Sequence, residues 1–445
     1  MKSYTTRVLI VALNYAPELT GIGKYVGEMT EWLAARDVSL RVITAPPYYP
    51  AWRTQAAYRH NWYSSESLSG AKVYRCPIYV PRRPRGLSRI LHVLSFALSS
   101  LPVLLWQALA WRPTIIFVVE PPLSAAPSAW LAAKLCGARS WLHIQDFEID
   151  AAFALGLLKS GPLRRVILAA EGWVMRRFDY VSSISDSMRA KIKSKGVRDA
   201  SSVTYPNWVD VKLIRPAERL NALRCELGIA PETRVALYSG NMGEKQGLEV
   251  ILDVARHFVN DTDVLFLLCG DGVVRERISR AAASLPNVRM IPLQPLARLN
   301  ELLNLADLHL LPQRAAMEDL VLPSKLAAML ASGQPVVATA RPDSDVARCA
   351  SVGGLIAPPG DTVAFEAAIR RLLADEILRR QLGATGRAFA LANWEREAVM
   401  RRTFAQVPVL ATAAGLTAAG LTTEAEPEFT ESVELVHADE QAVGR

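Results

Sequence analysis

The chain has 445 residues, of which 51% are hydrophobic and 21% charged, and its formal net charge is +8. This composition excludes a disordered or fibrous protein, and the length favours two domains over one. The five cysteines lie far apart without a C-x-x-C pair, which argues against a secreted disulfide framework or a zinc ribbon and favours a reducing compartment.

The positive charge is concentrated in the body of the chain. From Pro408 onward there are seven acids and one arginine, so the tail carries −6 and the remainder +14. A basic body suits anionic partners such as a membrane surface or nucleotide phosphates. No basic run alternates with aromatic residues as in a nucleic-acid reader, so nucleic acid is not expected as a partner.

Short apolar runs alternate with longer helical stretches along the whole chain. In the first half the runs are Val8–Tyr15, Leu40–Ala45, Val73–Tyr79, Thr114–Glu120, Trp141–Gln145 and Tyr180–Ile184. In the second half they are Val235–Ser239, Val264–Cys269, Val288–Pro292, Leu308–Leu311, Pro335–Thr339 and Gly354–Ala357. Such runs are typical of strands buried on both faces, and the intervening helices imply parallel crossovers. We predict an α/β protein of two tandem Rossmann-like domains, each with a doubly wound parallel sheet.

Changes in composition place the boundaries of these domains. The first domain is predicted at 1–206 and the second at 217–385, joined by a linker at 207–216 where prolines surround an asparagine. A C-terminal helix at 386–407 is expected to pack back toward the first domain. The tail at 408–445 has few large apolar residues and is expected to be flexible.

The segment 82–112 is basic at both ends and strongly apolar between Ile90 and Trp111. Three interpretations remain open: a helix that docks at the membrane interface, a core helix of the first domain, and a membrane span. A span would separate strands of one sheet. The first apolar run, Val8 to Leu13, is too short for a signal-peptide core, so we expect a cytoplasmic location, peripheral on the inner face of the membrane.

Glycine-bearing loops follow the first strand of each predicted domain. After the first lie Gly21, Gly23 and Lys24, in a turn that does not complete a dinucleotide fingerprint. After the second lie Gly240 and Lys245, where the ammonium group is a candidate for binding a diphosphate and otherwise a surface lysine in a turn.

A third candidate site is the sequence Leu322-Pro323-Ser324-Lys325 at the start of a predicted helix. Proline is favourable at a helix start, and the free N–H groups of the first turn together with Lys325 can bind an anion. Plain helix capping by Ser324 is the alternative.

Three motifs, N-Y-x-P-E-x-T-G-I-G-K-Y, S-G-N-x-G-E-K-Q-G-L-E and L-P-S-K-L, occur in this order between Val8 and Phe404. Together they make the chain resemble the bacterial glycosyltransferase family 4, and within it the colanic-acid and related exopolysaccharide enzymes thought to transfer fucose. The resemblance implies a GT-B fold, two domains facing across a cleft, with the nucleotide-sugar donor bound mainly by the second domain and the acceptor by the first.

The resemblance also implies retention of configuration at the anomeric carbon, no cofactor and no obligatory metal. The two D-x-D sequences, 261–263 and 343–345, lie in predicted surface loops rather than beside a donor. The donor is expected to be GDP- or UDP-linked and the acceptor a lipid-linked oligosaccharide, which would account for the apolar basic segment.

Residue roles follow from the same resemblance. His143 at a strand end is expected to face the reacting sugar, although a histidine inside an apolar strand is by itself more often a core residue. Asp146 and Glu148 are candidate ligands for acceptor hydroxyls. The usual pair of glutamates is replaced by Leu320 and Ala328, which leaves Asp319, or Glu318 beside it, as the expected contact of the donor sugar.

A second departure from the family pattern is Asn241, which stands where an arginine is usual. Transfer of a hexose, expected to be fucose, in exopolysaccharide synthesis is the predicted function. The alternatives are a nucleotide-sugar 2-epimerase of the same fold and a non-catalytic sugar- or nucleotide-binding subunit. The epimerase is disfavoured because its dense set of catalytic acids and histidine is not visible in the sequence.

Overall fold

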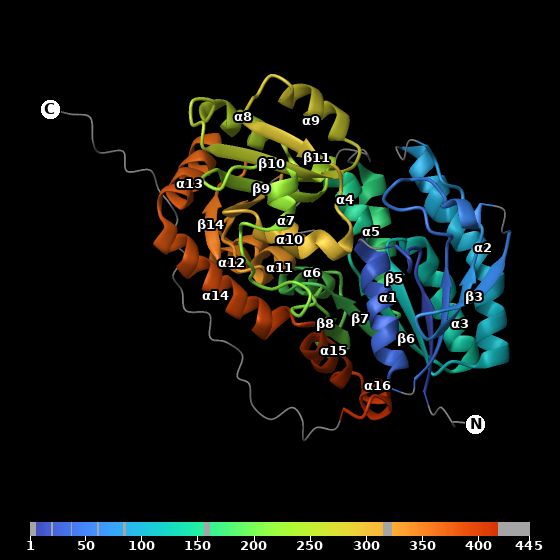
Figure 1. The fold of residues 1–445 in the computed structure, drawn as a ribbon. Helices are drawn as coiled ribbons and strands as arrows, with labels where there is room; N and C mark the ends of the chain where they lie inside the picture. The colour runs from blue at the N-terminus through green and yellow to red at the C-terminus, as the bar shows by residue number, and fades with distance from the viewer. Residues whose placement is uncertain are drawn as a thin grey trace. The chain divides into compact units, whose positions relative to one another are not determined.

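The computed structural model describes residues 6–18, 21–36, 38–59, 62–82, 86–154, 161–314 and 323–416. Within these ranges the chain divides into two compact units. Unit 1 contains the described residues up to Asn207 and those from Val399 onward, and unit 2 contains Trp208–Ala398. Each unit is built on its own sheet (Figure 1).

Unit 1 has an eight-stranded sheet in the order β3-β4-β2-β1-β5-β6-β7-β8. Its strands are β1 (Arg7–Val11), β2 (Ser39–Thr44), β3 (Ser64–Leu68), β4 (Ala71–Arg75), β5 (Ile115–Glu120), β6 (Arg139–Ile144), β7 (Tyr180–Ser183) and β8 (Ser202–Thr204). Its helices are α1 (Gly21–Ala34), α2 (Leu87–Trp111), α3 (Ala126–Cys136), α4 (Glu148–Ala154), α5 (Pro162–Met175), α6 (Asp186–Ser194), α15 (Arg396–Ala405) and α16 (Pro408–Ala413).

Two strands of this sheet were not predicted from the sequence. β3 is the polar sequence SSESL at the sheet edge, where one side is solvated and no apolar run is required. It pairs antiparallel with β4, so the prediction of a wholly parallel sheet is wrong at this edge. The turn between them, Ser69-Gly70, has positive φ at both residues, as tight hairpins require. The other unpredicted strand, β8, has only three residues and gives no periodic signal.

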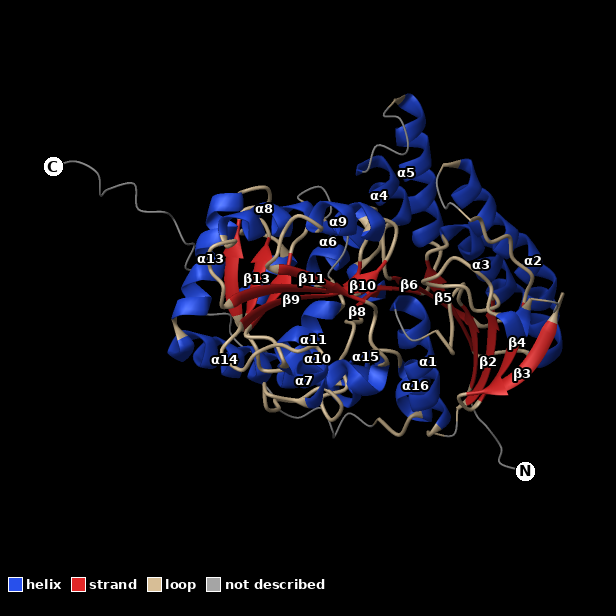
Figure 2. Ribbon diagram, turned by 45° about the horizontal axis from the view of Figure 1, so that its top comes forward, coloured by secondary structure: helices blue, strands red, loops and turns tan. Residues whose placement is uncertain are grey.

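Helices cover both faces of the sheet in unit 1 (Figure 2). On one face the side chains of α1, β6 and α15 meet in an aromatic cluster. Phe404 of α15 packs 5.4 Å from the Trp32 ring of α1 and 5.9 Å from the Trp141 ring of β6. Residues far apart in the chain therefore close one core, and α15 belongs to unit 1 although it follows unit 2 in sequence.

Helix α2 is attached to the sheet by a single stripe of side chains. The buried residues recur at helical spacing and include polar ones: His92, Phe96, Ser100, Leu104, Gln107 and Ala108. Arg41 of β2 donates a hydrogen bond to Gln107, and His92 is hydrogen-bonded at both ring nitrogens. This helix is long and apolar enough to cross a membrane, but only 28% of its most apolar window is buried within the protein.

The buried stripe of α2 argues against two of the three interpretations of this segment, the core helix and the membrane span. A core helix would be covered all round, whereas α2 exposes Leu87, Ile90, Leu91, Leu94, Leu98, Trp106 and Leu109. A span would require α2 to leave the sheet, and its buried polar groups would then lose their partners on β2 and the loop after it. Both interpretations are therefore wrong for this structure.

Unit 2 has a six-stranded parallel sheet in the order β11-β10-β9-β12-β13-β14. The strands are β9 (Arg234–Asn241), β10 (Val264–Asp271), β11 (Val288–Ile291), β12 (Leu308–Leu311), β13 (Val336–Thr339) and β14 (Gly354–Ala357). The helices are α7 (Ala222–Glu226), α8 (Glu249–His257), α9 (Arg275–Ala282), α10 (Leu299–Asn304), α11 (Lys325–Ala331), α12 (Asp345–Ser351), α13 (Thr362–Ala374) and α14 (Glu376–Trp394). One face of the sheet is covered by α8, α9 and α13, and the other by α7, α10 and α11 (Figure 2).

The structure differs from the predicted boundaries at three places. In the expected linker 207–216, Val209 and Ile214 are buried in the core of unit 2, because this stretch is apolar enough to pack. Position 386 lies inside α14 rather than at the start of a separate helix. The tail expected to be flexible from 408 begins instead with α16, whereas 417–445 lies outside the described residues.

Candidate functional site

The strand order of unit 2 reverses between β9 and β12, and the loops that follow these two strands meet there. The backbone N–H of Arg314, after β12, donates to the carbonyl of Lys245, after β9, over 3.1 Å. Gly247 has φ +60°, and a Cβ at this position would lie 3.1 Å from Cγ of Arg314. In open α/β sheets, ligands bind beyond the carboxyl ends of the strands at such a reversal.

Gly240 and Lys325 lie together at this edge. Gly240 has φ +127°, and a Cβ there would lie 3.6 Å from Cδ of Lys325. The Lys325 ammonium lies 3.9 Å from the centre of the Tyr238 ring, and its Nζ is buried without a hydrogen-bond partner. Burial lowers the pKa of Lys325 to about 7. A buried cation that lacks a counter-charge beside a glycine-lined strand end is what an anionic ligand would complete.

The glycine turn after β10 shapes the same edge. A Cβ at Gly270 would lie 2.0 Å from the carbonyl oxygen of Gly240, and one at Gly272 would lie 2.4 Å from that of Met242. Glycine is thus required at both positions for β9 and β10 to approach. Asn241, where an arginine was expected, has its Oδ1 2.8 Å from the same Gly272 position and so packs against this turn.

The other residues predicted to bind the donor show no comparable unpaired buried charge or lie outside the described residues. Ser324 is exposed and its side chain does not cap α11, so the capping interpretation is wrong here. Lys245 is half-buried in the short turn Glu244–Gln246. Glu318 and Asp319 lie outside the described residues. Arg314 was missed by the sequence analysis. Its backbone N–H contacts Lys245, while its guanidinium group pairs with Glu249 at 3.5 Å and Glu244 at 3.8 Å.

The lowered pKa of Lys325 predicts that diphosphate binding takes up a proton. Below pH 7 the Lys325 ammonium group of the free protein is already protonated. Above pH 7 it is mostly neutral, and binding of the anionic ligand raises the pKa of Lys325 and so causes it to take up a proton. Affinity for a nucleoside diphosphate should therefore be constant below pH 7 and weaken as pH rises above it. Isothermal titration at pH 8 in buffers of different ionisation enthalpy should show uptake approaching one proton in the wild type and less in Lys325→Met. Equal uptake in the two proteins would contradict the assignment.

In unit 1 the loop after β1 is organised around a buried carboxylate, Glu18. Its Oε1 accepts hydrogen bonds from the backbone N–H groups of Tyr48 and Tyr49, each 2.9 Å long, and its Oε2 accepts from Asn14 Nδ2 at 2.8 Å. A Cβ at position 23 would lie 2.9 Å from Oε2 and 2.8 Å from Cβ of Glu18. Gly23 is therefore required to make room for Glu18 and is not free to contact a ligand through this side.

Tyr49 lies over the same loop. Its Cε1 is 3.7 Å from the Cβ position of Gly21, which has φ +60°. Burial raises the pKa of Tyr49, and the negative charges of Asp146 and Glu18 raise it further. Lys24 points elsewhere, since it pairs with Glu28 at 3.8 Å one turn along α1.

The charges of Glu148 and Asp146 affect different side chains. Burial raises the pKa of Glu120, at the end of β5, well above its usual value, and the charges of Glu171 and Glu148 add to this effect. Of the two acids proposed from the sequence, Asp146 therefore raises the pKa of Tyr49, whereas Glu148 raises that of Glu120.

His143 occupies the interior of unit 1. The residue is 4% exposed, and its ring lies 4.8 Å from the Tyr205 ring. Its Nδ1 is 2.9 Å from Ser182 Oγ, and its Nε2 accepts a hydrogen bond from the Gln145 amide at 2.8 Å. Burial lowers its pKa to about 3. His143 thus shares the strand face of Trp141, which α15 covers, and its expected contact with the reacting sugar stays a prediction.

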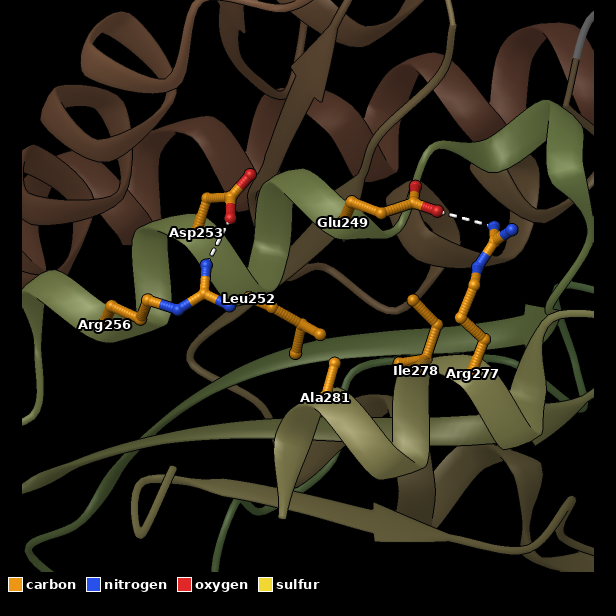
Figure 3. Close-up of a pocket in the computed structure, with 7 residues that line it drawn as sticks. All are labelled: Glu249, Leu252, Asp253, Arg256, Arg277, Ile278 and Ala281. Carbon is orange, nitrogen blue, oxygen red and sulfur yellow. Dashed lines mark hydrogen bonds and ion pairs between the residues drawn. The ribbon is translucent and has the colours of Figure 1, made fainter. Parts of the chain in front are cut away.

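A surface pocket of about 310 Å³ lies between α8 and α9 (Figure 3), and its Glu249 also pairs with Arg314 at 3.5 Å. Its acids already have partners: Glu249 pairs with Arg277 at 2.6 Å, and Asp253 pairs with Arg256. It offers no unsatisfied charge to a ligand. Across the described part of the chain, no group of three or more His, Cys, Asp or Glu side chains could hold a metal ion.

Comparison with known proteins identifies the two halves of the chain. Residues 20–208 match the glycosyl transferase 4-like domain, and residues 221–389 match glycosyl transferases group 1. The chain is 39% identical over 406 residues to the putative colanic acid biosynthesis glycosyl transferase WcaI of Escherichia coli K12, covering 89% of this chain and 98% of that protein. It is 28% identical over 307 residues to the probable glycosyltransferase WbjE of Pseudomonas aeruginosa, covering 68% and 74% of the two chains.

Solved structures agree on the architecture. Sucrose-phosphate synthase from Thermosynechococcus elongatus has a TM-score of 0.71 at 17% identity and covers 92% of this chain and 100% of its own. HepE of Anabaena, solved in complex with UDP-glucose, has a TM-score of 0.64 at 14% identity and covers 91% and 99%. At such identities the likeness shows the fold alone. The two domain matches and the Escherichia coli relative, which aligns along nearly its whole length, show the family, and the solved structures show the fold. The chain belongs to the bacterial glycosyltransferase family 4 and has the GT-B fold.

Proposed function

We propose that this protein transfers a hexose, fucose by the family resemblance, from a GDP- or UDP-linked sugar to a lipid-linked oligosaccharide during synthesis of a colanic-acid-like exopolysaccharide. The name of the Escherichia coli relative supports the pathway, and the UDP-glucose bound by HepE supports a nucleotide-sugar donor. The proposal places the reaction on the cytoplasmic face of the membrane.

The observation that carries the proposal is the cationic edge of unit 2. Lys325 Nζ is buried without a hydrogen-bond partner next to Gly240, and Lys245 lies on the neighbouring loop in contact with Arg314. Fixed positive charges at the place where a diphosphate leaves stabilise the charge that develops in the transition state. In the proposed mechanism these groups replace a metal ion, no cofactor takes part, and the anomeric configuration is retained.

Labelled GDP-fucose, UDP-glucose and UDP-galactose, each incubated with the protein and a membrane lipid extract, test the proposal. Label is expected to move from one donor into the lipid fraction and to do so in the presence of EDTA. Isomerisation of the donor would identify an epimerase instead. Donor binding without turnover would identify a non-catalytic subunit, and loss of transfer in EDTA would refute metal independence.

The exposed side of α2 supports the membrane part of the proposal. Leu91, Leu94 and Leu98 project from it, and Trp106 lies near its C-terminal end. Exposed aromatic residues flank the helix: the hydroxyl of Tyr63 donates to the carbonyl of Ser99 at 2.9 Å. An apolar helix face with aromatic residues beside it and arginines at its ends suits the headgroup boundary of a bilayer. We infer that α2 lies in the interface while its polar stripe remains on the sheet.

Substitution of one exposed leucine tests this surface. Leu98→Glu is expected to weaken binding to phosphatidylglycerol–phosphatidylethanolamine vesicles by about tenfold or more, because it removes an apolar contact and adds a negative charge. The matched control is Ile377→Glu on α14, since Leu98 and Ile377 are both 71% exposed. Vesicle co-sedimentation measures both. Equal binding by the wild type and Leu98→Glu would show that α2 does not dock.

A further inference from the structure

Trp52 lies in the loop after β2, at the carboxyl edge of the unit 1 sheet. The strand order of this sheet reverses between β1 and β5, and open α/β sheets bind ligands beyond the strand ends at such a reversal. Hydrogen bonds from the Tyr48 and Tyr49 N–H groups to Glu18 join the loop of Trp52 to the loop after β1. Trp52 is therefore attached to the edge of unit 1 at which a ligand is expected.

The backbone holds Trp52 in a conformation that bulky residues rarely adopt. Its φ is +49°, in the left-handed region where a Cβ is crowded. A hydrogen bond of 3.2 Å from the Arg53 N–H to the Tyr48 carbonyl closes the turn around it. Strain of this kind persists only where the surroundings fix it, and it is concentrated at ligand-binding sites. The turn thus has a feature that a simple connection between β2 and β3 does not require.

The indole ring of Trp52 is fixed by two neighbouring rings. Its centroid lies 5.1 Å from the His92 ring of α2 and 5.5 Å from the Tyr48 ring. His92 is itself held at both nitrogens, by the Tyr79 carbonyl at 2.6 Å and the Tyr48 hydroxyl at 2.9 Å. The position of the indole is therefore set before any ligand binds, which lowers the entropic cost of binding.

Part of the indole remains available to a ligand. Trp52 is half-buried, and its two ring contacts are inclined by 54° and 62°, so neither ring stacks in parallel on it. An arginine covers the rings of Trp32, Trp111 and Trp173, whereas among the described residues none covers Trp52 or accepts a hydrogen bond from its indole N–H. A rigid aromatic face of this kind suits the apolar C–H face of a sugar ring, and the N–H suits a hydroxyl group.

The contacts of Trp52 place it between α2 and the glycine loop. On one side is His92, and the residue before it in α2, Leu91, is 57% exposed on the surface proposed to contact lipid. On the other side is Tyr49 of the same turn, whose Cε1 lies 3.7 Å from the Cβ position of Gly21. A lipid-linked sugar whose apolar chain lies on α2 would therefore have its first ring next to Trp52.

We propose that Trp52 binds the first sugar ring of the acceptor by stacking its indole on the C–H face of that ring. The identity of the acceptor as a lipid-linked oligosaccharide rests on the function proposed above. The assignment itself concerns a sugar ring joined to an apolar chain. It makes Trp52 a binding residue of unit 1, separate from the donor residues of unit 2.

A binding experiment on the full chain tests this without transfer. Hexyl glycosides of glucose, galactose and fucose are titrated calorimetrically, beside hexyl tetra(ethylene glycol), which has the same chain and no sugar. The wild type should prefer at least one glycoside. For that glycoside Trp52→Leu should lose about tenfold in affinity, as expected when an aromatic anchor is removed, and Trp52→Phe, which keeps an aromatic face, should lose less.

Trp62→Leu is the matched control, because Trp62 is a tryptophan of the same unit and is 77% exposed. It should bind the glycoside as the wild type does. Absence of a preference in the wild type, unchanged affinity in Trp52→Leu, or equal losses in Trp52→Leu and Trp62→Leu would overturn the proposal. A lower melting temperature of Trp52→Leu with unchanged binding would assign Trp52 to packing alone.

Steady-state kinetics separate this inference from the proposed function. Trp52→Leu should raise the KM for the lipid-linked acceptor by about tenfold and leave the KM for the donor unchanged. An unchanged acceptor KM with normal transfer would refute the inference and leave the function intact. If the wild type transfers no sugar but binds a glycoside through Trp52, the function fails and the site stands.

Discussion

Replacing Lys325 by methionine is expected to lower kcat/KM for the donor sugar by about a hundredfold or more, the range found when a group that stabilises transition-state charge is removed. The reason is the position of its ammonium group, which is buried 3.9 Å from the Tyr238 ring without a hydrogen-bond partner. Methionine keeps the apolar stem and removes a buried charge, so the melting temperature should stay the same or rise. Steady-state kinetics with labelled donor and a thermal melt measure both effects.

Lys212→Met provides the control, because Lys212 is an exposed lysine of the same unit. It should leave the donor kinetics unchanged. A Lys325→Met enzyme within about threefold of the wild type would remove Lys325 from the diphosphate site, since a contribution of about 1.4 kcal/mol already corresponds to tenfold in rate. A lower melting temperature with normal kinetics would likewise assign Lys325 to packing.

Replacing Glu18 by alanine is expected to destabilise unit 1 and impair acceptor use. Two buried backbone N–H groups, of Tyr48 and Tyr49, would lose their acceptor, and an unsatisfied buried donor costs about 1–3 kcal/mol. For a unit of this size a loss of about 3 kcal/mol lowers the melting temperature by about 6–12 °C. Because Tyr49 would no longer be held over Gly21, the KM for the acceptor should rise while nucleoside diphosphate binding stays unchanged.

Glu18→Gln tests whether the loop needs the negative charge of Glu18 or only its hydrogen bonds. Its amide oxygen can still accept from both tyrosine N–H groups, and Asn14 can turn its own oxygen toward the new NH₂ group. This variant should recover most of the stability. Differential scanning calorimetry measures the melting temperatures of the two variants, and steady-state kinetics measure their KM for the acceptor. Equal melting temperatures for the wild type and Glu18→Ala would show that the carboxylate does not hold the loop.

The fold and the glycine turns of unit 2 were readable from the sequence because both depend on local patterns. Every predicted apolar run overlaps a strand in the structure, since strands buried on both faces need continuous apolar residues, although Val73–Tyr79 shares only its first three residues with β4. The glycines at 240, 270 and 272 mark places where backbones approach too closely for a Cβ, and that requirement is visible in the chain itself. The edge strand β3 was not predicted, because it is only partly buried and therefore needs no apolar run.

The site residues could not be settled in the same way, because their environment depends on segments distant in sequence. The family resemblance made His143 a candidate sugar ligand, and the register of β6 places it on the face of Trp141, under α15 from the other end of the chain. Asp146 and Glu148 are two residues apart, but the charge of Asp146 raises the pKa of Tyr49 and that of Glu148 raises the pKa of Glu120. Arg314 joins Lys245 only because β12 lies next to β9.

The apolar segment near 82–112 shows the same division. Its sequence by itself determined a long apolar helix edged by arginines, because hydropathy and charge are properties of the chain. Only the tertiary structure decided that one polar stripe of the helix, with His92 and Gln107, is hydrogen-bonded to the rest of unit 1, which leaves the leucines exposed. The physical reason is that periodicity defines the faces of a helix, whereas the elements packed against it decide which face is buried.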